Sequence, residues 1–94
     1  MMMMARICFD ADKAELGIAA LRAQGYEVLT HTFPDEPDYV FAEASRNEVS
    51  DEQMLDEVSH IIGPFGSVSD AGRIPSGHKP FQYATAAWRG IATD

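Results

Sequence analysis

The side chains with the greatest chemical potential in this 94-residue sequence are one cysteine and three histidines. Cys8 falls in an apolar run, and His31, His60 and His78 are spread along the chain without paired spacing. A structural zinc site needs four ligands, usually in closely spaced pairs, and a cysteine nucleophile needs an adjacent base. The pattern therefore predicts no metal site, no cofactor and no catalytic residue, and it favours a structural cysteine.

A second group of reactive side chains is acidic. Five carboxylates lie in two segments: Asp10, Asp12, Asp35, Glu36 and Asp38. In the predicted fold, both segments are loops at the same edge of the sheet. Converging carboxylate oxygens are the ligands that Ca²⁺ and Mg²⁺ prefer, but the spacing is not that of an EF-hand loop. We interpret this edge as a solvated acidic rim, with a cation site as the alternative.

The overall charge limits the class of partner. The sequence has 15 Asp and Glu residues against 7 Lys and Arg, which gives a formal net charge of −8. Duplex nucleic acid and anionic lipid surfaces both bind through Lys and Arg. We therefore expect neither duplex nucleic acid nor a membrane as partner. A protein partner or a second copy of this chain, giving a homodimer, is the expectation.

Location is predicted from the cysteine and the N-terminus. A single cysteine cannot form an intrachain disulfide, which fits a reducing compartment. The Met1–Met4 run is too short for a signal peptide and carries no basic segment before it. The expected location is the cytoplasm.

The element with the clearest pattern is a helix within residues 49–64. Ser50 and Gln53 have the spacing of a capping box, and Val49 and Met54 have that of a hydrophobic staple. An apolar stripe then recurs at helical period: Met54, Leu55, Val58, Ile61 and Ile62. This stripe predicts that the helix packs on a sheet.

The opposite side of the same helix is acidic. It is formed by Asp51, Glu52, Asp56 and Glu57. We expect this acidic face, which runs from Ser50 to His60, to meet a basic partner surface. Gly63 is predicted to adopt the left-handed conformation that ends many helices, and Pro64 prevents continuation.

An earlier helix is predicted between Asp12 and Gly25. Asp12 and Glu15 have the spacing of an N-terminal cap, and Gly25 stands at the C-terminal position that favours glycine. The predicted apolar stripe is Leu16, Ala19, Ala20 and Ala23, widened by Ile18 and Leu21.

Four segments are predicted as strands: residues 6–9, 26–33, 39–46 and 67–74. The order β-α-β-β-α-β is the ferredoxin-like pattern of the α+β class. Right-handed crossovers place both helices on one face of a four-stranded antiparallel sheet. Residues 1–74 are predicted to form this domain.

Residues 75–94 are predicted to form a linker and a docking tail. Phe81, Ala84, Thr85 and Trp88 have helical spacing, which indicates a short helix. A helix of this length is marginal alone in water, so it must dock on the open sheet face or on a second subunit.

Strand alternation predicts which side chains lie on the helix-free face of the sheet. Small side chains at Ala42 and Ala44 suit close helix packing, so Tyr39 and Phe41 are expected to point the other way as an exposed aromatic patch. Such a patch usually marks an interface, with base stacking on RNA as the alternative. The candidate binding surface comprises Arg6, Cys8, His31, Tyr39, Phe41 and Trp88.

Residues 21–73 contain a helix, the segment Gln24-Gly25-Tyr26-Glu27-Val28, a hairpin, a Ser-capped acidic helix and a Pro-Phe-Gly segment starting at Pro64. This arrangement resembles the bacterial regulator of ribonuclease E activity, type B family. The resemblance implies an α/β sandwich that binds and inhibits ribonuclease E without being an enzyme.

That family carries a Gly-Gly pair and then Asp-Gly-Trp after its last helix. Gly66 and Asp70 match this pattern, whereas Ser67 and Ala71 stand in place of glycines and no tryptophan follows. The resemblance therefore assigns no functional residue in this chain.

These patterns together predict a non-enzymatic acidic module that acts by protein binding, as a regulator or inhibitor. The alternative is a dimeric α+β barrel, in which two sheets pack face to face and His31, Tyr39 and Trp88 line a small-molecule or catalytic pocket. A purely structural accessory subunit is a third interpretation that the sequence does not separate from the first.

Overall fold

The structure, a computed structural model, describes residues 1–81 of the chain. This range contains four strands and two α-helices, and a 3-10 turn at Ala11–Lys13 leads into the first α-helix. The elements are β1 (Met2–Asp10), α1 (Ala14–Ala23), β2 (Glu27–His31), β3 (Tyr39–Asn47), α2 (Asp51–Ile62) and β4 (Gly66–Arg73). In the described range no helix is long and apolar enough to cross a membrane.

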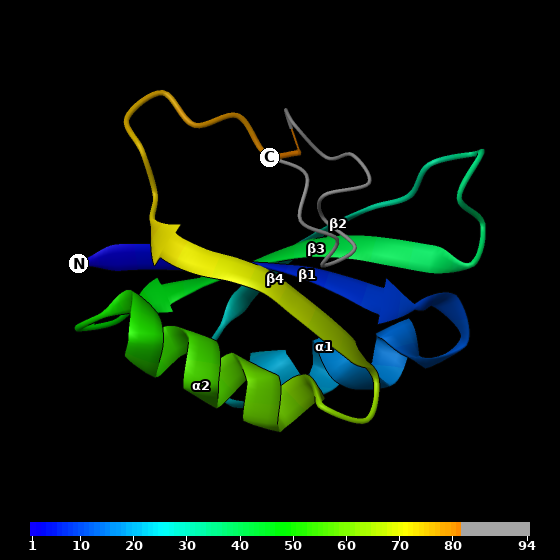
Figure 1. The fold of residues 1–94 in the computed structure, drawn as a ribbon, viewed down its shortest axis with the longest axis horizontal. Helices are drawn as coiled ribbons and strands as arrows, with labels where there is room; N and C mark the ends of the chain where they lie inside the picture. The colour runs from blue at the N-terminus through cyan, green and yellow to red at the C-terminus, as the bar shows by residue number, and fades with distance from the viewer. Residues whose placement is uncertain (82–94) are drawn as a thin grey trace.

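The strands form one antiparallel sheet in the order β2-β3-β1-β4. Both α-helices cover the same face of this sheet (Figure 1). The architecture is α+β and is consistent with a ferredoxin-like fold. β1 and β3 pair along their whole length, from Met2 opposite Asn47 to Asp10 opposite Tyr39.

The pairing of β1 with β4 contains an irregularity. Arg6 lies opposite Asp70, whereas the next residue, Ile7, lies opposite Val68. Ser69 is therefore an extra residue in β4, as in a β-bulge. The bulge leaves Asp70 beside Arg6 on the helix-free face, where the two side chains form an ion pair.

The main core lies between the sheet and the two helices. Alternate residues of β1 point into it, including the fully buried Ala5, Ile7 and Phe9. Ala42 and Ala44 of β3 are also fully buried, and their small side chains allow the helices to lie close to the sheet. The helices contribute Leu21, Met54, Val58 and Ile62.

The start of α2 follows the prediction in part. Ser50 has an extended backbone, and its Oγ accepts a hydrogen bond from the Gln53 N–H at 3.1 Å. The reciprocal half of the capping box is wrong, because the Gln53 amide instead donates to the Glu57 carboxylate at 3.2 Å. The hydrophobic staple is also wrong, since Val49 is 83% exposed and Met54 is fully buried.

The packing stripe and the end of α2 differ slightly from the prediction. Met54, Val58 and Ile62 are buried, whereas Leu55 remains 39% exposed at the edge of the stripe. Gly63 does not adopt the left-handed conformation; its φ of −42° is right-handed helical. The glycine is accommodated as a continuation of the last turn.

The predicted N-terminal cap of α1 is wrong, and the predicted stripe is right only for the two residues that widen it, since Leu21 is buried and Ile18 packs against the core. The cap position is Lys13, and no side chain caps the helix there. The buried residues are Ala14, Gly17 and Leu21, and Leu16 is 62% exposed. The reason is close packing: a Cβ at Gly17 would lie 2.3 Å from the ring of Phe9, so α1 approaches β1 through its glycine.

After β4 the chain folds back over the helix-free face of the sheet (Figure 1). We call residues 75–81 the strap. The strap is the described part of the predicted linker and tail. The predicted short helix between Phe81 and Trp88 lies, apart from Phe81, outside the described residues, and so does Trp88 of the candidate surface.

Candidate functional site

The helix-free face carries two neighbouring rows of side chains that run across the sheet. The strand registers place Leu29, Glu43, Arg6 and Asp70 in one row. They place His31, Phe41, Cys8 and Ser67 in the adjacent row. Three of the four side chains in the first row are charged, whereas the second row holds none of the Asp, Glu, Lys or Arg residues, so the two rows differ in chemical character.

The second row lies in a small aromatic cluster that is separate from the main core. Cys8 and Phe41 are its buried members, at 5% and 1% exposure. Phe33, Tyr39 and Phe81 pack against them. The prediction of an exposed patch is therefore wrong for Phe41, because side chains from the turn and the strap cover it.

His31 belongs to the same cluster through two ring contacts. Its imidazole makes an edge contact with Phe33 at a centroid distance of 4.6 Å. It also stacks on Phe81 at 5.3 Å with an interplanar angle of 25°. The backbone of Phe81 has a φ of 63°, which a bulky L-residue rarely adopts.

Glu43 is the functional candidate that the sequence reasoning missed. Its side chain is among the few charged groups that are buried in the described structure, at 5% exposure. His78 Nε2–H donates to one carboxylate oxygen at 2.8 Å, and the Phe81 N–H donates to the other at 2.8 Å. The one sequence signal for this site is that Glu43 interrupts the apolar residues of β3 with a charged side chain.

Arg6 lies between two carboxylates. Its Nε donates to Asp70 Oδ1 at 2.7 Å, and its Nη2 also pairs with Asp70. The hydrogen bond that Arg6 donates to Asp70 raises the pKa of Arg6; burial opposes this shift, and the charges of Asp70 and Glu43 add to it. Arg6 therefore stays cationic and compensates the negative charge of this row.

The acidic face of α2 lies on the other side of the molecule. Asp51, Glu52 and Asp56 are exposed, as the sequence predicts. Glu57 differs from them, because it is half-buried and accepts hydrogen bonds from Gln53 and Tyr26. The available acidic surface therefore consists of three carboxylates around the half-exposed Leu55.

Glu57 belongs to a polar network between α2 and the end of β3. Arg46 pairs with both Glu48 and Glu57, and its Nη1 donates to the carbonyl of Gln24 at 2.7 Å. The guanidinium also lies 4.1 Å from the centre of the Tyr26 ring. This network has a structural role, because every described member is engaged with another.

The network shifts the pKa values of Tyr26 and Glu57 in opposite directions. Burial is the largest cause that raises the pKa of Tyr26, and the neighbouring Glu57 and Glu48 raise it further against the opposing charge of Arg46. The pKa of Glu57 shifts in the opposite direction, downward. Desolvation raises its pKa, but hydrogen bonds from Tyr26 and Gln53 and the charge of Arg46 outweigh it, so the pKa is lowered.

We expect Tyr26 to remain protonated at a pH where free tyrosine ionises. Because its folded pKa is raised above the unfolded value of 10.0, its contribution to stability is complete below about pH 10 and decreases as the pH rises further. Ultraviolet absorbance of the phenolate, recorded during alkaline titration, measures this. Tyr26→Phe should remove the late ionisation step, and an unchanged titration curve in that variant would contradict the assignment.

The acidic edge brings its two loops together as expected from the topology. The Ala11 N–H donates to the Asp38 carbonyl at 2.9 Å. The Lys13 Nζ lies 4.0 Å from Asp10 Oδ2. Within residues 1–81, however, no three His, Cys, Asp or Glu side chains are grouped so that they could hold a metal ion. The edge therefore offers no basis for a cation site.

No family model matches this chain, and no curated protein or solved structure matches it. The resemblance to the regulator of ribonuclease E activity, type B family therefore stays a prediction.

Proposed function

We propose that this chain is a non-enzymatic acidic module that acts by binding another protein, as a regulator or inhibitor. The observation that carries the proposal is the outer face of α2. Asp51, Glu52 and Asp56 are exposed there around Leu55, which is itself 39% exposed. Among residues 1–81, none of these three carboxylates takes part in an ion pair.

This arrangement supports protein binding for two physical reasons. Exposed carboxylates accelerate encounter with a basic surface and select against acidic ones, while an apolar side chain among them adds area that is removed from water on binding. The helix that carries this face is held in place, because Ser50 caps its start and Met54 and Val58 are buried in the core. A surface whose backbone is already ordered has less entropy to lose on binding.

The sheet face is less available to an external partner than the sequence suggested. His78 and Phe81 of the strap already contact Glu43 there. A dimeric barrel needs two such faces to pack directly against each other. The alternative function therefore requires the strap to leave first, and we favour α2 as the binding surface.

We expect Glu52→Lys combined with Asp56→Lys to weaken partner binding about tenfold, because each lost or reversed surface pair contributes up to about 1 kcal/mol. The family resemblance makes purified ribonuclease E the first partner to test, followed by proteins retained from a native lysate. Binding should also weaken as salt is raised, because exposed charges are screened.

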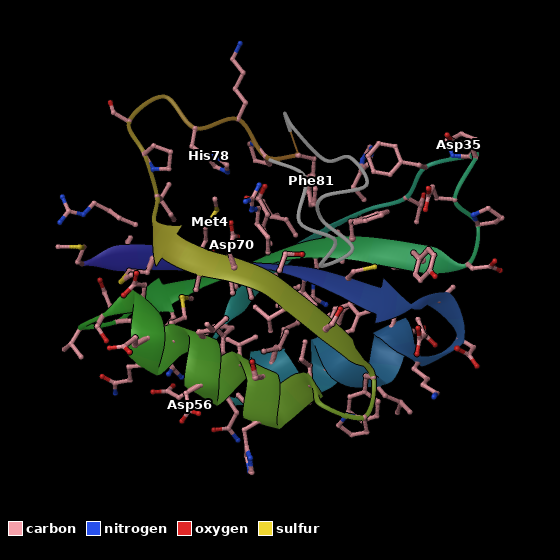
Figure 2. The ribbon with its side chains drawn as sticks, viewed as in Figure 1. Met4, Asp35, Asp56, Asp70, His78 and Phe81 are labelled. Carbon is pink, nitrogen blue, oxygen red and sulfur yellow. The ribbon has the colours of Figure 1, made fainter. Side chains whose placement is uncertain are left out.

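The matched control is Asp35→Lys combined with Asp38→Lys, which changes the net charge by the same amount. Figure 2 shows Asp56 on the outer side of α2 and Asp35 at the turn across the sheet. Binding should be retained in this control. Equal loss in both variants would mean that net charge, and not the α2 face, is responsible.

A further inference from the structure

The strap contacts the helix-free face at two places, and the polar one is Glu43. A buried carboxylate is costly unless it is paired and hydrogen-bonded. Both oxygens of Glu43 are engaged by the strap, one by the His78 ring and one by the Phe81 backbone N–H, each at 2.8 Å. Arg6 faces Glu43 across the strands and remains bound to Asp70.

The apolar contact of the strap lies one row away from Glu43. The Phe81 ring stacks on His31 and packs against the cluster that contains Cys8 and Phe41. His78 and Phe81 are three residues apart, so a single short segment makes both contacts. Figure 2 shows both side chains on the helix-free side of the sheet.

The connection between β4 and this segment is exposed. Pro75, Ser76 and Gly77 are all exposed, and Gly77 takes a left-handed φ of 76°. The left-handed conformation of Phe81 is unfavourable for an aromatic residue. The contacts of Phe81 with Glu43 and His31 offset part of this cost, so the strap is held in place by tertiary contacts and not by its local backbone preference.

We propose that this face is a peptide-recognition site that the strap occupies in the free protein. Its external occupant is a segment of a partner protein that presents a cationic or N–H-donating side chain and, three residues later, an aromatic ring. Such a segment satisfies Glu43 and the aromatic cluster in the same way as the strap, and it competes with the strap. This proposal is independent of the α2 surface.

Cys8 provides a built-in reporter for the test. It is the only cysteine in the sequence, and it is buried in the cluster against which Phe81 packs. In the full-length chain, His78→Ala combined with Phe81→Ala should increase the rate of Cys8 modification by a thiol reagent about tenfold or more. Lys79→Ala, an exposed position in the same segment, should leave the rate unchanged.

A synthetic peptide with the sequence of residues 75–81 and blocked ends is then added to the double variant. The peptide should restore slow modification of Cys8, and a scrambled peptide should not. Adding Glu43→Gln to the variant should abolish the restoration, because the amide no longer provides a charged acceptor. Circular dichroism checks that all variants remain folded.

The proposal is overturned if the peptide leaves the rate in the folded double variant unchanged, or if it protects the Glu43→Gln variant equally. It is also overturned if light scattering shows a concentration-dependent dimer of the wild-type chain that the His78→Ala, Phe81→Ala variant does not form. In that case the occupant is a second copy of this chain and not a foreign segment.

Discussion

Replacing Gly66 with alanine is expected to lower the free energy of unfolding by about 3 kcal/mol. Gly66 begins β4 and lies opposite Phe9 of β1. A Cβ at this position would lie 2.3 Å from the Cys8 carbonyl oxygen and 2.8 Å from the Phe9 Cα. Both are backbone atoms of the central strand, so the contact is relieved only by separating β4 from β1.

Gly72→Ala is the matched control in the same strand. A Cβ at Gly72 meets nothing within 4 Å. Alanine has less conformational freedom to lose on folding than glycine, so this variant should gain about 0.5–1 kcal/mol. Urea unfolding of both variants measures the difference, and equal stability of the two would contradict the close approach of β4 to β1.

Arg46→Ala should lower the free energy of unfolding by about 3 kcal/mol, because removing one partner of a buried ion pair leaves an uncompensated charge. The Glu48 side chain is only 5% exposed and accepts hydrogen bonds from Arg46, with the Nε bond at 2.9 Å. The same guanidinium bridges to Glu57 on α2 and to the Gln24 carbonyl after α1. Its loss therefore affects three elements together.

Two further variants test whether the lost stability of Arg46→Ala comes from the unpaired Glu48 carboxylate or from the removal of any arginine side chain. Arg73→Ala removes an exposed arginine from β4 and should change stability by no more than about 0.5 kcal/mol. Glu48→Gln in the Arg46→Ala background should recover part of the loss, because it removes the unpaired carboxylate. If Arg46→Ala costs no more than Arg73→Ala, the network has no structural role.

The order of elements could be predicted because local signals agreed with the global fold. Ser50 marks the start of α2, Gly25 with its φ of 89° follows α1, and apolar residues at period two mark the strands. The same alternation placed Cys8 and Phe41 together on the side of the sheet away from the helices. These features are determined by residues that are close together in the sequence, so local patterns are sufficient to predict them.

Features that depend on contacts between distant elements could not be predicted. The buried face of α1 is centred on Gly17, which has no side chain and therefore no hydrophobic signal. The burial of Glu43 depends on His78 and Phe81, which lie 35 and 38 residues further along the chain. A strand pattern gives the direction of a side chain but does not indicate what covers it.

Photo-crosslinking from α2 tests the central claim, that this face binds a partner, most directly. A benzophenone amino acid replaces Leu55 at the centre of the acidic face, and a control chain carries it at Asp35. We predict a discrete protein adduct from position 55 that unlabelled wild-type chain competes away and that Glu52→Lys with Asp56→Lys abolishes. Adducts from position 35 with none from position 55 would contradict the proposal that α2 is the binding surface.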